Sequence, residues 1–384
     1  MFGAALLCFY PYLLSLFPCS NSYDLVRDYS GPSFFNGWDF YGSWDNLTLG
    51  DVWWLDYASA IQQNLAYVNE HNRVIIKVDN VTTVPFNEKR NSIRITSQNS
   101  YGVGSLWIID LTHLPHGCSV WPAFWSKGPH WPDNGEIDII EGVNLMDTNQ
   151  YALHTLPGCS QPRGVWQTGA SGETDCSQPS GCVVSERSPS SFGETFAAAG
   201  GGVWAAQFDV AGIFIWFWSR ADLPPSILQA TATSSIDISG WGPPSASYPA
   251  SGCDICRFFT AQHLVIDITL CGIWAGLPAV YNPHCLHSGS TGRCYDDNVV
   301  GPGSPKYDSA YFEINYVRAY TTGGPAPTST PSSTLVNPSS ISTALSLPAP
   351  TNTSFFPTIF VNTSLNPVIG GVDIMSCQFS FWPW

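Results

Sequence analysis

Short runs in which apolar and polar residues alternate recur along the chain, separated by Gly, Pro, Asn and Ser. Residues 92–96 (SIRIT) and 312–317 (FEINYV) show this period of two, which is typical of β-strands with one buried and one solvated face. No long stretch repeats with the helical period of 3.6. The pattern therefore predicts an all-β fold, an antiparallel β-sandwich of the jelly-roll type.

The predicted strands are spread over most of the chain, and no internal sequence repeat suggests a propeller or a solenoid. The clearest candidates are RVIIKVDN (73–80), NSIRITSQ (91–98), GSLWIIDLTHL (104–114), GEIDIIEG (135–142), QYALHTL (150–156), GIFIWFWS (212–219), LVIDITLCG (264–272) and YFEINYVRAY (311–320).

The two ends of the chain differ from the part that carries the strand pattern. Residues 1–22 are apolar, interrupted by proline and followed by small residues, so we predict a signal peptide cut after Ser20 or Ser22; a buried N-terminal segment is the alternative. Residues 23–322 form one predicted domain. Residues 323–384 are rich in Pro, Ser and Thr and are predicted to be a disordered tail. Asp373 interrupts the apolar end of that tail, so we expect membrane attachment only if a GPI anchor is present.

Composition narrows the choice of partner. Only 11% of residues are charged and the net charge is -15, so the chain lacks the basic surface that binds nucleic acid. Sixteen Trp and sixteen Tyr stand beside 14 Lys and Arg, which favours a neutral ligand with flat apolar faces, such as a sugar polymer.

Sequons and cysteines agree with a secreted protein, located outside the cell or in the cell wall. Sequons occur at Asn46, Asn80, Asn352 and Asn362. Of twelve cysteines, Cys8 and Cys19 fall in the leader, Cys377 falls in the tail, and nine lie between Cys118 and Cys294. We expect several disulfides, and the odd number leaves one cysteine over. The pair Cys253 and Cys256 alone does not indicate a zinc or redox motif.

One segment, DNGEIDIIEG (133–142), concentrates three carboxylates, Glu136, Asp138 and Glu141, among isoleucines. A solvated strand face is the simplest alternative, and a calcium loop does not match the spacing. Three like charges on one strand repel each other, however, and tryptophans crowd the flanks. A catalytic role explains this combination better.

A β-bulge would bring the two glutamates together. On a regular strand Glu141 points away from Glu136, but one extra residue absorbed at Ile139-Ile140 returns it to the same face. The glutamates are then roughly 13 Å apart along the backbone, at about 3.3 Å per residue, and leaning side chains close much of that gap. The result approaches the carboxyl separation of about 5–5.5 Å that retaining glycosidases use.

In a retaining mechanism Glu136 is the ionised nucleophile and Glu141 holds the proton for the leaving oxygen, then acts as the base toward water. Asp138 hydrogen-bonds Glu136 and keeps a charge nearby, which raises the proton affinity of its neighbours.

The segment GCSVWPAFWSKGPHWPDNGEIDIIEGVN resembles glycoside hydrolase family 16, in particular secreted fungal laminarinase-like endo-β-1,3(4)-glucanases, whose bulged E-x-D-x-x-E signature it contains. SFFNGWDF, RNSIRITS, QYALHTLPGC, ITLCGIWAG and YFEINYVRAY extend the resemblance over nearly the whole domain. It implies a jelly roll with a concave substrate cleft.

The resemblance also implies roles for individual residues. Glu136 matches the nucleophile, Asp138 the assisting aspartate and Glu141 the acid/base. The expected substrate-binding residues are Trp125, Trp131, His154, Trp274 and Arg94, with ordinary strand positions as the alternative for His154 and Arg94. Trp121 is assigned to the core. Ile273 stands where the family usually has Asp, beside Trp274, and Cys256 is an addition to the pattern.

The leading hypothesis is a secreted, monomeric, retaining endo-β-glucanase that acts on β-1,3 or mixed β-1,3/1,4 glucan. It has no metal in its active site and requires no cofactor, and a structural calcium ion is compatible with the sequence. Two alternatives stay open. One is a cell-wall transglycosylase with the same residues. The other is a glucan-binding protein without catalysis, which would be expected to lack a catalytic glutamate, whereas both are present.

Overall fold

The computed structural model describes residues 22–322 of the 384-residue chain. The predicted leader up to residue 21, the predicted tail (323–384) and the cysteines and sequons within them lie outside the described residues.

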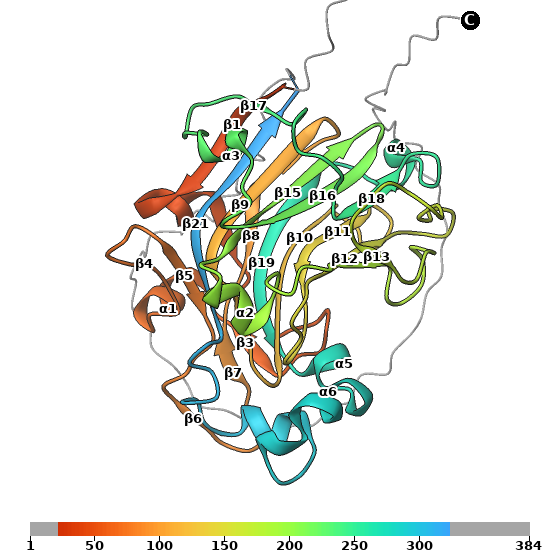
Figure 1. Ribbon diagram of the computed structural model, residues 1–384. Helices are drawn as coiled ribbons and strands as arrows, with labels where there is room; N and C mark the ends of the chain where they lie inside the picture. Colours follow the sequence, from red (N-terminus) through yellow and green to blue (C-terminus); the bar gives the residue numbers. More distant parts are fainter. Residues whose placement is uncertain (1–21, 323–384) are drawn as a thin grey trace, which may run out of the picture. The chain divides into compact units, whose positions relative to one another are not determined.

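One large antiparallel sheet, which we call the cleft sheet, has the strand order β13-β14-β12-β11-β10-β19-β8-β2 (Figure 1). The bounds of its strands are β2 (Trp38–Phe40), β8 (Arg94–Tyr101), β10 (Val120–Lys127), β11 (Glu136–Glu141), β12 (Gln150–His154), β13 (Ala170–Ser171), β14 (Cys182–Ser185) and β19 (Gln262–Leu270).

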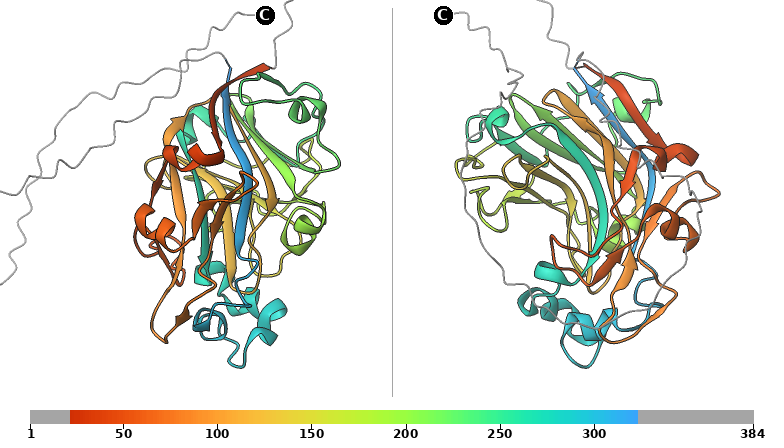
Figure 2. Two further views of the ribbon diagram at one scale, coloured as in Figure 1. Left: turned by 90° about the vertical axis from the view of Figure 1, so that its left-hand side faces the viewer. Right: turned by 180° about the vertical axis from the view of Figure 1, so that it is seen from behind.

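A second antiparallel sheet, the back sheet, has the order β17-β1-β21-β9-β15-β16-β18, with β5 paired to β21 and β4 paired to β5 (Figure 1; Figure 2 shows the fold in two further views). Its strands are β1 (Ser22–Ser30), β4 (Ala66–Val68), β5 (Val74–Lys77), β9 (Ser105–His113), β15 (Gly202–Asp209), β16 (Gly212–Ser219), β17 (Ile236–Asp237), β18 (Ala246–Pro249) and β21 (Tyr311–Thr321).

The core fills the space between these sheets. Ile95, Ile266 and Ile268 of the cleft sheet and Ile109 and Val317 of the back sheet are buried in one continuous hydrophobic cluster. Alternate positions on each strand point into it, and burying one such side chain contributes about 1.5–3 kcal/mol. All eight segments with the clearest strand pattern form strands, which confirms the predicted antiparallel sandwich.

Short elements cap the sandwich. Two small sheets pair β20 (Gly301–Pro302) with β6 (Thr83–Val84) and, in parallel, β3 (Val52–Trp54) with β7 (Arg90–Ser92). The helices are α1 (Tyr57–Gln62), α2 (Gly193–Ala198), α3 (Pro225–Leu228), α4 (Ile255–Phe258), α5 (Gly272–Ala275), α6 (Pro278–Cys285), η1 (Gly31–Gly37), η2 (Leu286–Ser288) and η3 (Tyr295–Val299). Elements this short cannot show a 3.6-residue period, so the sequence did not predict them. Within residues 22–322 no helix has the length and apolarity needed to cross a membrane.

Four disulfides confirm the expectation of several bridges. Eight of the nine cysteines between Cys118 and Cys294 form the pairs Cys118–Cys285, Cys159–Cys253, Cys176–Cys182 and Cys271–Cys294. Cys253 thus bonds to Cys159 rather than to Cys256. The pairs that contain Cys118 and Cys271 fasten the 271–294 segment, with α5 and α6, to the ends of β10 and β19, beside the cleft sheet.

Candidate active site

A cleft of about 390 Å³ opens on the cleft sheet. Seven of the eight predicted site residues line it, namely Arg94, Trp125, Trp131, Glu136, Asp138, Glu141 and His154. The eighth, Trp274, does not. Seven residues that were chosen from the sequence alone therefore line one continuous surface.

The predicted bulge is present in β11. On the β10 side, Asp138 pairs with Trp125 and Ile140 with Phe124, which leaves Ile139 as the extra residue. On the β12 side, Asp138 pairs with Ala152 and Glu141 with Gln150, so the two isoleucines again face one residue. Ile137, Ile139 and Ile140 all enter the core, and Glu141 returns to the cleft face.

Strand pairing places the cleft side chains in three adjacent rows across the sheet. The first row contains Arg94, Asp267, Ala123 and Glu141; the second contains Trp125 and Asp138; the third contains Lys127, Glu136 and His154. Each of the three carboxylates on β11 therefore occupies its own row. The small Ala123 lies between Asp267 and Glu141, which leaves room above the centre of the sheet.

Each glutamate accepts a hydrogen bond from one tryptophan. The indole N–H of Trp121 donates to Glu141 Oε1 at 3.0 Å, and the indole N–H of Trp131 donates to Glu136 Oε2. The two donors differ in burial, because Trp121 is buried whereas Trp131 is 58% exposed. Trp121 is thus more than the core residue that we expected: it holds one of the carboxylates.

Burial dominates the acidity of these glutamates. It raises the pKa of Glu136 to about 7, and hydrogen bonds from Trp131 and Asp138 oppose the rise. It raises the pKa of Glu141 to about 8, where the bond from Trp121 opposes the rise and the charge of Glu136 adds to it. The order suits unequal roles, since Glu141 keeps its proton to higher pH than Glu136.

Asp138 lies between the glutamates and prefers to be neutral. Burial, followed by the charges of Glu136 and Glu141, raises the pKa of Asp138 well above its ordinary value. A protonated Asp138 donates its hydrogen bond to Glu136, so it orients that carboxylate without adding the charge that we expected from the sequence.

His154 is the cross-strand neighbour of Glu136, and its Nε2 lies 3.5 Å from Asp138 Oδ2. Burial lowers the pKa of His154 to about 4, so the imidazole is neutral near pH 7. It is a polar neighbour of the carboxylates rather than a cation.

Arg94 forms part of the cleft floor. Its side chain is 3% exposed, and the guanidinium lies 4.7, 5.1 and 5.5 Å from the ring centroids of Tyr41, Trp54 and Trp125. Its Nε and Nη1 have no hydrogen-bond partner among the residues described. The aromatic faces around it hold the cation in place.

Asp267 is a fourth carboxylate in the cleft, from the neighbouring strand β19. It accepts a hydrogen bond of 3.0 Å from the indole N–H of Trp125. Burial raises the pKa of Asp267 to about 7, and the charge of Arg94 opposes the rise. Trp125 is itself buried, so it presents only part of its ring to the cleft.

Trp274 is absent from the lining of the cleft. Its ring packs edge-on against Trp121, at 5.3 Å between centroids, in a small cluster with Val143 and Ala275. The neighbouring Ile273 lines the cleft instead and is 54% exposed. The position at which the family usually has Asp therefore presents an apolar side chain here.

Sequence reasoning missed three residues that contact or flank the carboxylates: Trp121, Lys127 and Asp267. Lys127 lines the cleft and pairs across the strands with Glu136. A strand model of VWPAFWSK with period two would have placed positions 121, 123, 125 and 127 on one face and so found two of them. Asp267 belongs to a distant strand, and no local signal identifies it.

Within the described part of the chain, no group of three or more His, Cys, Asp or Glu side chains is arranged to hold a metal ion. The carboxylates of the cleft are instead neighbours of indole N–H groups, of Arg94 and of Lys127.

A model of the XgeA-like catalytic domain of glycoside hydrolase family 16 matches residues 38–320. A probable glycosidase of Schizosaccharomyces pombe is 38% identical over 309 residues, which cover 78% of this chain and 70% of that protein. An endo-1,3(4)-beta-glucanase of Emericella nidulans is 34% identical over 313 residues, 80% of this chain and 49% of that protein. The chain thus spans about half the length of this second relative.

Solved structures agree with the sequence comparison. Laminarinase 16A of Phanerochaete chrysosporium, with 6-O-glucosyl-laminaritriose in its donor and acceptor sites, has a TM-score of 0.73 and 34% identity, and covers 78% of this chain and 100% of its own. An elongating β-1,3-glucosyltransferase of the same family has a TM-score of 0.71 and 36% identity, with the same coverage. The chain therefore belongs to glycoside hydrolase family 16, with the jelly-roll sandwich of that family, and it is a glycoside hydrolase.

Proposed function

We propose that this protein is a secreted, retaining endo-β-glucanase that hydrolyses β-1,3 or mixed β-1,3/1,4 glucan. The observation that carries the proposal is the bulge in β11, which brings Glu136, Asp138 and Glu141 to one face of a cleft. The names of the relatives support the choice of substrate, because they include an endo-1,3(4)-beta-glucanase and a laminarinase.

In the first step the ionised Glu136 attacks the anomeric carbon of the bound glucan. The bond from that carbon to the glycosidic oxygen breaks, and protonated Glu141 gives its proton to the departing oxygen. The products are a glycosyl ester on Glu136 and a shortened chain with a free hydroxyl. The neutral Asp138 supports this step by donating a hydrogen bond to Glu136.

In the second step water replaces the departed sugar. Glu141, now ionised, takes a proton from the water as its oxygen attacks the anomeric carbon. The ester bond to Glu136 breaks, and both glutamates return to their starting states. Two inversions give net retention of configuration. Every proton and bond in this cycle is supplied by the chain, by substrate or by water, so the reaction requires no cofactor.

Aromatic and polar side chains of the cleft suit a neutral sugar polymer. The exposed face of Trp131 stacks on the C–H face of a pyranose, and the ring edge of Trp125 borders the same space. Arg94 borders the floor of this space. We assign no direct sugar contact to Trp274, since it is absent from the cleft lining and packs against Trp121.

Secretion is part of the proposal and is supported by the leader-like start of the sequence, the sequons and the four disulfides. We expect a monomer that meets its substrate outside the cell or in the cell wall, with membrane attachment only through a GPI anchor.

Product analysis tests the proposal. Purified protein is incubated with laminarin and with lichenan, reducing ends are counted, products are sized, and the anomeric form of the first product is followed by NMR. We expect oligosaccharides with retained configuration, and none from the Glu136→Gln variant. Binding of laminarin without release of reducing ends would overturn the hydrolase function, and an inverted first product would overturn the role of Glu136.

Transglycosylation is a second candidate because a similar solved structure is a glucosyltransferase. In that case a sugar hydroxyl, rather than water, attacks the glycosyl ester. Products longer than the laminarin oligosaccharide supplied would identify it in the same experiment.

A further inference from the structure

We propose that Asn46 carries an N-linked glycan that occupies the Tyr41 end of the cleft. Asn46, Leu47 and Thr48 form a sequon, the sequence that accepts such glycans in secreted proteins, and all three residues line the cleft. Asn46 is exposed, so a sugar on its side chain has free space. The inference rests on the proposed secretion, and its effect on substrate choice rests on the proposed activity.

The loop that carries the sequon is held at a fixed position by Asp45. This carboxylate is fully buried and accepts hydrogen bonds from the backbone N–H groups of Leu47 and Thr48, both at 3.0 Å, and of Gly50 at 3.1 Å. It also accepts one from the hydroxyl of Thr269, at 2.7 Å, on the cleft strand β19. A glycan on Asn46 therefore starts from a rigid base beside the cleft.

Close backbone packing fixes the other side of the same loop. The N–H of Ile273 donates to the carbonyl of Thr48 at 2.9 Å. A Cβ on Gly50 would lie 1.8 Å from Thr269 Oγ1, so the loop approaches β19 as closely as glycine allows.

The surface around Asn46 suits a sugar. Trp44, Leu47 and Ile273 are exposed apolar side chains, and the hydroxyl of Tyr41 donates to Asn46 Oδ1 at 2.7 Å. Sugars offer C–H faces to apolar side chains and hydroxyls to polar ones, so the first sugars of the glycan shield this patch from water.

A glycan in this place competes for space with side branches of the substrate. The chain of a linear glucan needs only the floor of the cleft, where Arg94 and the carboxylates lie. A branch that points out of the floor at the Tyr41 end meets the glycan. The glycan therefore favours unbranched over branched glucan.

A second sequon within the described residues, at Asn80, gives a matched control. Asn80 accepts a hydrogen bond from Lys77 Nζ and donates one to Asp308, both at 2.7 Å, and it is absent from the lining of the cleft. A glycan there changes mass and solubility as one on Asn46 does, without entering the cleft.

The first test is independent of activity. The full chain is secreted from a eukaryotic host, peptide mass spectrometry reports occupancy at Asn46, and hydroxyl-radical footprinting reports the exposure of Tyr41 and Trp44 before and after endoglycosidase treatment. We expect an occupied Asn46 and increased labelling of both residues after treatment, with Trp131 as the unchanged reference. An unmodified Asn46, or occupancy without any change in labelling, overturns the inference.

The second test measures specificity. The quantity measured is kcat/KM on 6-O-branched laminarin divided by kcat/KM on linear β-1,3-glucan. We expect this ratio to rise by about threefold or more when the glycan is removed, either by endoglycosidase or by the Asn46→Gln substitution. Asn80→Gln should leave the ratio unchanged. An unchanged ratio in Asn46→Gln overturns the specificity role. If neither glucan is cleaved, the proposed function fails instead, and footprinting alone decides whether the glycan covers the cleft.

Discussion

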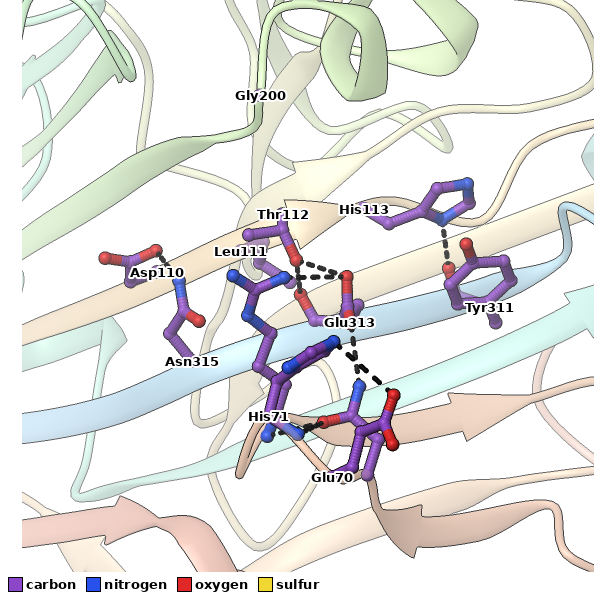
Figure 3. Close-up of polar contacts among 12 residues, drawn as sticks. Glu70, His71, Asp110, Leu111, Thr112, His113, Gly200, Tyr311, Glu313 and Asn315 are labelled. Atoms are coloured by element: carbon purple, nitrogen blue, oxygen red, sulfur yellow. Dashed lines mark hydrogen bonds and ion pairs between the residues drawn. The ribbon is translucent and has the colours of Figure 1, made fainter.

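Carboxylates occur on two faces of the molecule, the cleft face of the cleft sheet and the outer face of the back sheet. The carboxylates of the two faces differ in their hydrogen-bond partners. Glu313 of β21 represents the outer face, since its neighbours Phe312 and Ile314 point into the core. It accepts hydrogen bonds from Thr112 Oγ1 at 2.6 Å and Asn69 Nδ2 at 2.8 Å, with Arg73 Nη1 at 3.5 Å (Figure 3 shows the contact with Thr112).

Asp110 of β9 repeats this arrangement on the same face. Both of its oxygens are bound by the Arg220 guanidinium, at 2.6 and 3.0 Å, and Asn315 Nδ2 adds a bond of 2.7 Å (Figure 3 shows the contact with Asn315). A bidentate Arg pair of this kind is among the strongest charge-assisted contacts.

The carboxylates of the cleft face have fewer hydrogen-bond donors. Glu136 and Glu141 each accept one indole N–H, and Asp138 Oδ2 has no hydrogen-bond partner among the residues described. Arg94 lies nearby but stacks on aromatic rings instead of binding a carboxylate in the bidentate manner of Arg220. Buried charge without a partner is costly, so these groups hold protons into the neutral range.

The difference indicates how the carboxylates of each face can act. On the outer face the carboxylates connect strands and are satisfied by the fold. On the cleft face their incomplete satisfaction is what allows one glutamate to be ionised while the other remains protonated.

The largest expected effect separates the two faces by activity. Glu136→Gln removes the proposed nucleophile and should lower kcat by roughly 10³-fold or more. Glu313→Gln, the matched change on the outer face, should leave kcat within about twofold and lower the free energy of unfolding by about 1–3 kcal/mol, because it weakens charge-assisted bonds. Reducing-end assays and urea unfolding of both variants measure this. Comparable loss of activity in both would contradict the comparison.

Stability should depend on pH because of the cleft. An unfolded glutamate titrates near pH 4.3, whereas Glu136 and Glu141 have pKa values of about 7 and about 8 in the folded protein. Between these values the folded state binds more protons than the unfolded state, so stability falls as pH rises and the loss is complete above about pH 8.

Urea unfolding at pH 5 and pH 8.5 measures that loss, which we expect to be roughly 2–4 kcal/mol. The double variant Glu136→Gln/Glu141→Gln should show a clearly smaller difference, because neither glutamine titrates. Asp110→Asn, on the outer face, should retain the wild-type difference. An undiminished difference in the double variant would show that other groups cause it.

The two indole donors should move opposite limbs of the activity profile. The Trp131→Phe variant lacks the indole N–H that stabilises ionised Glu136. The pKa of Glu136 therefore rises, and the acid limb of the profile shifts to higher pH. In the Trp121→Phe variant the pKa of Glu141 rises for the same reason. Glu141 then stays protonated to higher pH, and the alkaline limb of the profile shifts to higher pH. We expect shifts of several tenths of a pH unit to about one unit in kcat/KM profiles. Lower activity with both limbs unmoved would mean that the indoles only pack.

The sequence predicted what depends on local pattern. The alternating strands and the doubled Ile139-Ile140 follow from side-chain period and face, and both are present. Strand β10 was harder to predict from the sequence, because Pro122 argues against a central strand. It is tolerated because pairing with β11 begins only at Ala123, so Pro122 has a strand neighbour on the β19 side alone.

Contacts between segments that are distant in the sequence could not be predicted from local pattern. Trp125 and Asp267 are 142 residues apart, and Trp121 is 20 residues from Glu141. Which indole reaches which carboxylate depends on strand order and register, and these follow from packing of the whole sandwich rather than from any segment.

Trp274 gives the smallest expected effect and defines where the cleft face ends. The family resemblance places it in substrate binding, but it packs edge-on against Trp121 outside the cleft lining. Trp274→Phe keeps an aromatic ring in that cluster, so we expect KM for laminarin to change by less than about twofold, with a loss of stability of about 1 kcal/mol from the smaller ring. Ile273→Ala, one residue earlier and in the cleft, is the matched comparison and should change KM more than it changes stability. If Trp274→Phe instead raises KM severalfold at unchanged stability, the sugar-binding surface extends beyond Trp121, and the cleft face is wider than the lining residues suggest.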